Sequence, residues 1–139
     1  MTLIAKKPVP PSDLIYLSSP YSHPDFNVRH ARYRAALITV AHYLHQGIYL
    51  YSPILHNHPI VCYRDLPDAS VWLEYDYAVL SRCSSMWVLR IPGHNTSLGV
   101  RAESEFCTEH GISWDFIDPP FDKSFSLGSF VDFGGPDGR

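Results

Sequence analysis

Apolar segments of two lengths alternate along this chain, and this alternation constrains its fold more than any other feature. The short runs are of strand length and cover residues 14–18, 48–54, 85–91 and 112–118. The longer segments carry apolar residues at helical spacing and cover residues 26–47, 70–83 and 99–111. Strands that alternate with helices form a parallel sheet that helices cover on both faces. The sequence therefore predicts an α/β fold with such a sheet, of four or five strands.

Residues with capping preferences predict where these helices begin and end. We expect Asn27 to cap the first helix, and either Ser70 or Asp68 to cap the second. Gly47 and Gly111 are expected to end the first and the third helix, because glycine commonly follows the last helical turn.

Two further segments are predicted to be irregular. Residues 52–69 are rich in proline, histidine and aspartate, which favours a loop. Residues 119–139 are expected to form an irregular tail after a core of about 14–118. A length of 139 residues without an internal repeat predicts a single domain over 1–139.

Charge and composition restrict the possible partners. A net charge of −3 argues against binding to a nucleic-acid polymer, which requires a basic surface. No apolar run reaches the roughly 18 residues of a membrane span, and the first residues show no signal-peptide pattern. Cys62, Cys83 and Cys107 form no CxxC pair, so neither a disulfide framework nor a zinc ribbon is indicated. These features predict a cytoplasmic protein that contacts neither membranes nor nucleic acid.

The loops that follow the predicted strands are rich in small, polar and imidazole side chains. Their sequences are "SSPYSHP", "SPILHNHP" and "PGHNTSLG". Because ligands of parallel α/β sheets bind outside the carboxyl ends of the strands, these loops predict a pocket for a small molecule. The candidate binding residues in them are Ser18, Ser19, Pro20, Tyr21, His56, His58, Ser97 and Gly99.

Three carboxylates lie in the predicted helices next to these loops. Glu103 and Glu105 are two positions apart, so they point to different faces of their helix. Either could simply complement the helix dipole, which favours acids near a helix N-terminus. Asp76 shares an otherwise apolar stripe with Trp72 and Val79. Since a buried carboxylate needs partners or a raised pKa, Asp76 is either a structural acid or an active-site carboxylate.

Basic side chains gather at the start of the first predicted helix. Arg29, Arg32 and Arg34 fall in its first two turns, where cations oppose the helix dipole. They form either a solvated basic face or a site in which one of them, with Arg29 as the candidate, holds an anion at the helix N-terminus.

The histidines raise the question of a metal. His56 and His58 form an HxH pair that could chelate a metal ion from an extended chain, but no third ligand follows at a recognisable spacing. We therefore expect them to pack in the loop or to contact substrate, without a metal. The chain also contains neither GxGxxG nor a Walker A motif, so we expect no cofactor.

Four motifs in order carry a resemblance to a known family. They are "IYLSSPYS", "SPI.H.HP", "WLEYD" and "S.GV..E". Over residues 14–118 the chain resembles the nucleoside 2-deoxyribosyltransferase superfamily, in particular its short bacterial and phage branch and the related nucleotide N-hydrolases. The resemblance implies a Rossmann-like single domain that cleaves or transfers the N-glycosidic bond of a nucleoside or nucleoside 5′-monophosphate.

The resemblance also implies roles for individual residues. In that superfamily the glutamate of the Ser-x-Gly-Val-x-x-Glu pattern attacks the anomeric carbon of the sugar, which implies a nucleophile at Glu103 and leaves Glu105 solvated. It implies that Asp76 is a proton donor or a ligand of a ribose hydroxyl group, that Tyr16 hydrogen-bonds the nucleophile, and that Ser97 contacts a phosphate. A retaining cleavage needs two such carboxyl groups about 5 Å apart.

The chain departs from that pattern in its first loop. The hydrolases carry a phosphate-binding arginine there, whereas this chain has Ser22 near that place. Recognition of a phosphate would then move to Arg29 or Arg32.

The same resemblance implies an assembly and leaves two rival functions open. Its members are dimers or larger, so we expect a homodimer or homotetramer, and the apolar tail segment "FDKSFSLGSFVDF" could take part in it. One rival is a non-catalytic module that binds or senses a nucleotide on the same fold. The other is a hydrolase of an NAD-like dinucleotide.

Overall fold

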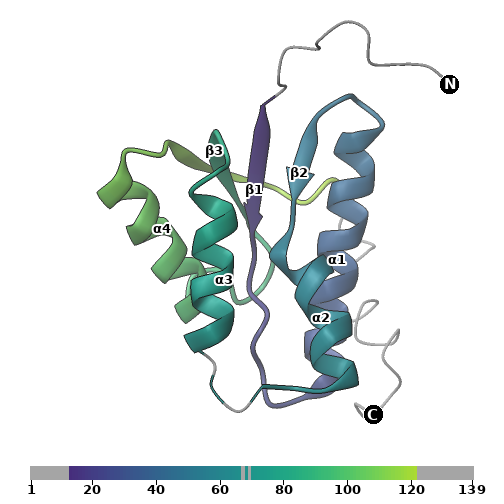
Figure 1. The fold of residues 1–139 in the computed structure, drawn as a ribbon. Helices are drawn as coiled ribbons and strands as arrows, with labels where there is room; N and C mark the ends of the chain where they lie inside the picture. The colour runs from purple at the N-terminus through teal and green to yellow at the C-terminus, as the bar shows by residue number, and fades with distance from the viewer. Residues whose placement is uncertain (1–12, 67, 69, 122–139) are drawn as a thin grey trace, which may run out of the picture.

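The predicted α/β architecture is confirmed by a computed structural model that describes residues 13–66, 68 and 70–121 (Figure 1). Its four strands are β1 (Leu14–Ser18), β2 (Tyr49–Tyr51), β3 (Ser85–Leu89) and β4 (Trp114–Ile117). The helices of this described part are α1 (Phe26–Leu44), α2 (Pro53–Tyr63), α3 (Ser70–Leu80) and α4 (Leu98–His110). All three strand pairs are parallel, in the order β2-β1-β3-β4. The fold is therefore Rossmann-like, with four strands.

The strand order reverses direction at β1, the first strand of the chain and a central strand of the sheet. Tyr16 of β1 pairs with Tyr51 of β2 on one side and with Met86 of β3 on the other. The chain therefore leaves β1 toward one edge and later returns to the opposite edge through β3. In open parallel sheets, the crevice at the carboxyl ends of such neighbouring strands is the usual ligand position.

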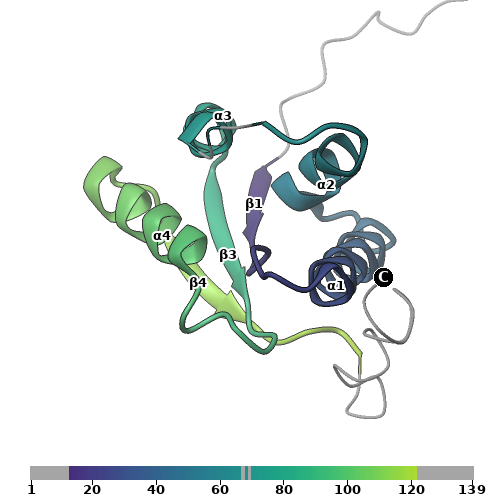
Figure 2. The same ribbon diagram turned by 90° about the horizontal axis from the view of Figure 1, so that it is seen from below.

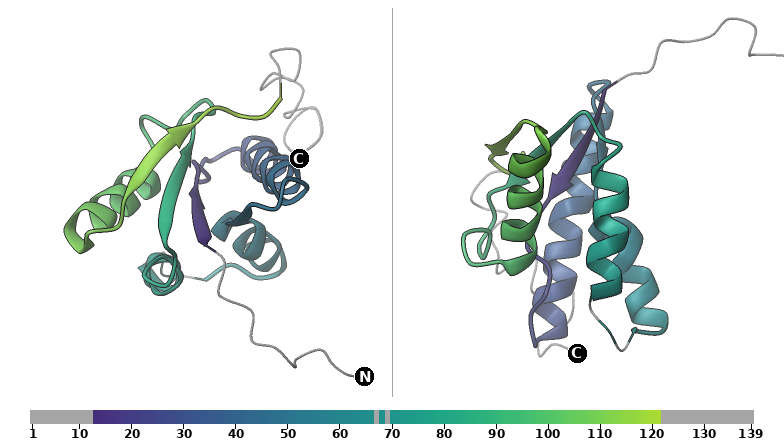
Figure 3. Two further views of the ribbon diagram at one scale, coloured as in Figure 1. Left: turned by 90° about the horizontal axis from the view of Figure 1, so that it is seen from above. Right: turned by 60° about the vertical axis from the view of Figure 1, so that its left-hand side comes forward.

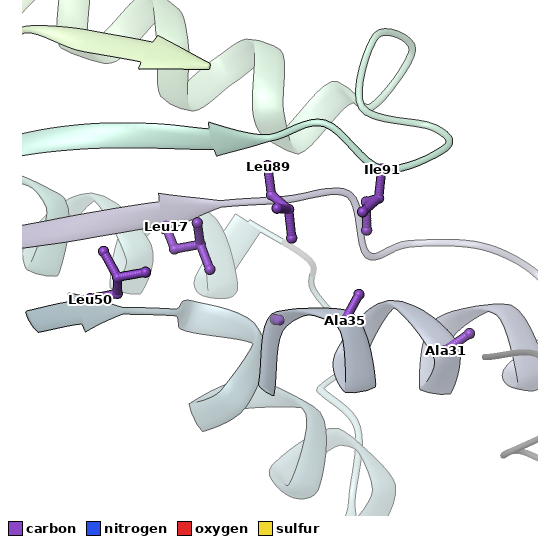
Figure 4. Packing of buried hydrophobic residues seen from close by; sticks show 7 residues of the cluster. Leu17, Ala31, Ala35, Leu50, Leu89 and Ile91 are labelled. Atoms are coloured by element: carbon purple, nitrogen blue, oxygen red, sulfur yellow. The ribbon is translucent and has the colours of Figure 1, made fainter. Parts of the chain in front are cut away.

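Helices cover both faces of the sheet, α1 on one face and α3 with α4 on the other (Figures 2 and 3). Alternating side chains of each strand supply the two cores. Leu17 and Leu89 pack toward Ala31 and Ala35 of α1, whose small side chains allow a close approach (Figure 4). Tyr16, next to Leu17 in β1, belongs to the core on the opposite face. The two residues on either side of Leu17 therefore point toward α3 and α4.

Helix α2 corrects the expectation of a loop over residues 52–69. Ser52 caps it by accepting a hydrogen bond from the Leu55 N–H at 3.4 Å, and proline is favoured at its first position. Pro59 inside the helix gave the segment the appearance of a loop. Its buried residues Ile54, Asn57 and His58 follow the helical spacing i, i+3, i+4. The helix packs beside α1 and against β1.

The predicted helix limits are correct in part. Asp25 caps α1 instead of Asn27, because its Oδ1 accepts the Asn27 N–H at 2.8 Å. The helix ends at Leu44, before Gly47. Asp68 is one of the two expected caps of α3, and its Oδ1 accepts a hydrogen bond from the Ser70 N–H at 2.9 Å.

Two further predictions concern the end of α4 and the C-terminal tail. Gly111 follows α4 in a left-handed conformation with φ of 71°, which confirms the expected end of that helix. Of the expected irregular tail, residues 122–139 lie outside the described residues, and so does the tail segment with its phenylalanines. Within residues 13–66, 68 and 70–121, none of the helices is long and apolar enough to cross a membrane.

Gly93 offers a test of the loop between β3 and α4. Its φ is 99°, and a Cβ atom there would overlap the guanidinium group of Arg32. We expect Gly93→Ala to lower the free energy of unfolding by about 1–3 kcal/mol, because a non-glycine residue is strained in this region. In Gly99→Ala the new Cβ would meet only Ser97 Oγ at 3.8 Å, so this control should be neutral or slightly stabilising. Urea denaturation of both variants measures the difference, and equal midpoints would contradict it.

Candidate functional site

A buried carboxyl group, that of Glu103, lies at the centre of the candidate site. The Tyr16 hydroxyl group donates to its Oε2 at 2.7 Å, and the Ser18 hydroxyl group donates to its Oε1 at 2.6 Å. Both donors come from β1, two positions apart, so the strand presents them on the same face. The Glu103 residue is only 5% exposed. Each oxygen of the carboxyl group therefore has its own donor.

The position of Glu103 follows from the buried stripe of α4. Val100, Glu103 and Cys107 are the buried residues of this helix and recur at i, i+3 and i+7. Glu105 lies on the exposed face, where its Oε2 is 3.4 Å from Arg101 Nε. The two glutamates thus point to different faces of α4, as the sequence predicts.

Burial controls the ionisation of this group. It raises the pKa of the Glu103 carboxyl group to about 7, although the hydrogen bonds from Ser18 and Tyr16 act in the opposite direction. Burial and the neighbouring charge of Glu103 raise the pKa of Tyr16 far above its ordinary value. Tyr16 therefore remains a hydroxyl donor throughout the physiological pH range.

Asp76 of α3 supplies a second carboxyl group. Burial raises its pKa to about 6, against the effects of a hydrogen bond from Asn57 and of the nearby His56. The charge of Asp76 in turn raises the pKa values of Glu103 and Tyr16, so the three groups act on one another. Asp76 is half-buried, whereas Glu103 is almost fully covered.

Asn57 holds Asp76 and is a residue that the sequence analysis missed. Its Nδ2 donates to Asp76 Oδ1 at 3.0 Å, and it is 8% exposed. A signal is present in the sequence, because Ile54, Asn57 and His58 have helical spacing, but the proline and histidine content of the segment favours a loop. Tyr51 of β2 was also missed, and its ring centroid lies 6.0 Å from that of Tyr16.

The two histidines of α2 take part in different networks. His56 Nδ1 is 2.8 Å from Asn57 Oδ1, which connects it to Asp76. His58 is 3% exposed, and its Nδ1 is 2.6 Å from the Tyr21 hydroxyl group. Burial lowers the pKa of His58 to about 4, so its ring is neutral at physiological pH. These contacts favour packing for His58 and Tyr21, whereas His56 is linked to the Asp76 carboxyl group through Asn57.

The arginines of α1 bind the loop between β1 and α1. Arg29 Nη1 donates to the carbonyl oxygens of His23 at 2.5 Å and Pro24 at 3.2 Å. Arg32 Nη1 donates to the Ser22 carbonyl oxygen at 2.9 Å. These contacts give both guanidinium groups a structural role in this loop.

The remaining predicted binding residues lie in two places. Ser19 and Pro20 are buried directly after β1, and Ser19 Oγ has no hydrogen-bond partner within the described residues. Ser97 caps α4, since its Oγ accepts the Val100 N–H at 3.2 Å. It also lines an open cavity of about 440 Å³. Glu103 is not among the described residues that line this cavity, and neither is Gly99.

The arrangement can therefore support chemistry with two carboxyl groups. Glu103, Tyr16 and Ser18 are in direct contact, and Asp76 lies within electrostatic reach of Glu103 and Tyr16. An ionised carboxylate can act as a nucleophile, and a carboxylic acid whose pKa lies near neutrality can donate a proton. Among the described residues, no group of three or more His, Cys, Asp and Glu side chains is placed to hold a metal ion.

Comparison with models of known protein families gives a match that covers most of the chain. A model of the protein family described as a domain of unknown function (DUF1937) matches residues 13–115. This region includes β1 through α4 and the first residues of β4, and so contains the whole carboxylate site. No curated protein matches the chain.

The raised pKa of Glu103 predicts how stability changes with pH. Because the folded protein binds this proton more tightly than the unfolded chain, the free energy of unfolding should fall as pH rises from about 4.5 to 7. The fall should be about 3 kcal/mol, since one pKa unit corresponds to about 1.4 kcal/mol. Glu103→Gln should remove this contribution, whereas Glu105→Gln, on the exposed face, should keep it. Chemical denaturation at several pH values tests this, and parallel curves for the two variants would contradict it.

Proposed function

The chain belongs to the DUF1937 family, and we propose that it cleaves or transfers the N-glycosidic bond of a nucleoside or nucleoside 5′-monophosphate. The observation that carries this proposal is the Glu103 carboxyl group held between the hydroxyl groups of Tyr16 and Ser18. Its position at the carboxyl end of β1, where the strand order reverses, is the usual ligand position of this architecture. The four motifs that resemble the nucleoside 2-deoxyribosyltransferase superfamily support the same reaction.

In the proposed first step, Glu103 attacks the anomeric carbon of the sugar. A bond forms between a carboxylate oxygen and this carbon while the bond from the carbon to the base nitrogen breaks. The electron pair of the broken bond moves to the base, which takes a proton from Asp76. Positive charge develops on the sugar ring in the transition state, and the nearby Glu103 carboxylate stabilises it. Tyr16 and Ser18 keep the carboxylate oriented.

In the proposed second step, a water molecule or a second base attacks the same carbon from the opposite side. The carbon–oxygen bond to Glu103 breaks, and Asp76, now ionised, accepts the proton of the attacking group. This returns both carboxyl groups to their starting states, as a retaining mechanism requires. Asp76 is less buried than Glu103, which favours approach of the nucleoside from the side of α3.

The pKa values of the pair determine how much of the protein is in the reactive form. At a pH between 6 and 7 both groups exchange protons readily, since the pKa is about 6 for Asp76 and about 7 for Glu103. The reactive form needs Glu103 ionised and Asp76 protonated. This form is a minor one, because Asp76 has the lower pKa of the two.

We also propose that the protein works as a homodimer or homotetramer. Several large apolar side chains are exposed on α2, on α3 and on the segment that joins these helices, which is typical of a contact surface. They are Ile60, Tyr63, Leu66, Val71 and Tyr75. Light scattering on the full-length chain measures the assembly, and a fully active monomer would contradict it.

The first test of the function is release of free base. Purified protein is incubated with nucleosides and their 5′-monophosphates, and the products are separated by chromatography. We expect release by the wild type, none by Glu103→Ala, and most of the activity in Glu105→Ala, which alters an exposed glutamate of the same helix. Equal activity of Glu103→Ala and the wild type would refute the assigned nucleophile. Binding without turnover would instead indicate a nucleotide-sensing module, and nicotinamide release from a dinucleotide would indicate the other rival.

The second test concerns Asp76. Asp76→Asn should slow base release by ~10²–10⁴, the range for losing a general acid. In the wild type, the rate should fall below about pH 6 because Glu103 becomes protonated, and above about pH 7 because the acid loses its proton. Asp76→Asn should lose the fall at high pH. A wild-type rate that rises with pH and then stays level would indicate that Asp76 binds a ribose hydroxyl group instead.

A further inference from the structure

Asn57 connects α2 to the carboxyl group of α3 through an amide. Its Nδ2 donates to Asp76 Oδ1 at 3.0 Å, and the residue is 8% exposed. No direct role in bond cleavage follows from this contact, because Asn57 touches Asp76 and not Glu103. The amide can act only through the carboxyl group that it binds.

The Asn57 amide also belongs to a longer chain of polar contacts. Asn57 Oδ1 can only accept, so His56 donates to it from Nδ1, at 2.8 Å. In the neutral ring this leaves His56 Nε2 as an acceptor, and it faces the Tyr75 hydroxyl group at 3.4 Å. The donors therefore run in one direction, from Tyr75 through His56 and Asn57 to Asp76.

The orientation has a consequence for the proton of Asp76. In a carboxylic acid the carbonyl oxygen is the better acceptor, and the proton resides on the other oxygen. Because Asn57 donates to Oδ1, protonated Asp76 should carry its proton on Oδ2. We propose that Asn57 is a positioning residue that keeps the transferable proton of Asp76 on Oδ2, available to the leaving base. This role rests on the proposed function.

Several other groups act on Asp76 and must be held constant in a test. They are Glu103 of α4, Tyr16 of β1, Tyr51 of β2, and His56 of α2. Asn57→Leu changes none of these residues and removes the amide at nearly constant volume, together with the oxygen that His56 Nδ1 contacts. Asn95→Leu, in the exposed loop before α4, makes the same chemical change away from the carboxyl groups.

The first measurement needs no substrate. The titration of the Asp76 carboxyl carbon is followed by NMR in the wild type, Asn57→Leu and Asn95→Leu. A hydrogen bond from the amide stabilises the ionised form, so its loss should move the midpoint of Asp76 upward by about one pH unit. The midpoint in Asn95→Leu should not move. If Asn57→Leu does not fold, Asn57→Ala removes the same donor with a smaller side chain.

The second measurement follows base release against pH. In Asn57→Leu the fall at high pH should move upward together with the NMR midpoint. The rate divided by the fraction of protein that carries ionised Glu103 and protonated Asp76 should fall by about twofold or more, since the proton is then shared between the two oxygens of Asp76. If Asn57 had a purely structural role, its loss would lower stability and would move neither the Asp76 midpoint nor the fall of the rate at high pH. If the wild type is active and a folded Asn57 variant keeps both the Asp76 midpoint and the pH profile of the rate, the positioning role is overturned. If the wild type releases no base but the Asp76 midpoint still moves in Asn57→Leu, the proposed function is refuted. The contact between Asn57 and Asp76 is then established all the same.

Discussion

The hydrogen bonds from β1 to Glu103 are the interaction on which this architecture depends. A carboxyl group that is almost fully removed from water is costly unless donors replace its hydration. Tyr16 and Ser18 supply one hydroxyl group to each oxygen. They can do so only because β1 lies between β2 and β3, which places its side chains in the interior on both faces. Tyr16 is itself fully buried, so the strand, the helix and the carboxyl group depend on one another.

The second carboxyl group is held by a different part of the chain. Asp76 receives its amide donor from α2, which packs beside α1 and not beside α4. The two carboxyl groups and the amide that binds Asp76 therefore come from three separate helices, α4, α3 and α2, which surround β1. Each carboxyl group is tuned by burial together with a neutral donor, and none of the contacts described for them comes from a lysine or arginine. Neutral donors leave both pKa values near neutrality, where a salt bridge would have lowered them.

Much of this arrangement could be predicted from the sequence, because it rests on simple periodicities. The alternation of strands and helices gave the parallel sheet, and the spacing of Glu103 and Glu105 placed them on different faces of their helix. The residues of α2 could not be placed in the same way. Pro59 and the surrounding histidines have low helix preference, and contacts with α1 and β1 stabilise the helix where local preference does not. Asn57 was missed for that reason, and the contacts of Arg29 with loop carbonyl groups could not be predicted from the sequence.

Helix α3 is attached to the sheet less firmly than α4, and this difference bears on motion. Within its residues 70–80, Leu80 alone is buried, whereas Val71 and Tyr75 are largely exposed. Segments with few buried apolar contacts open at lower free energy than the core around them. Helix α3 is therefore expected to open at a lower free energy than β1 and α4, which hold Glu103 and its donors. Such opening would carry Asp76 away from Glu103, so the two carboxyl groups would stay close to each other only while α3 is packed against the sheet.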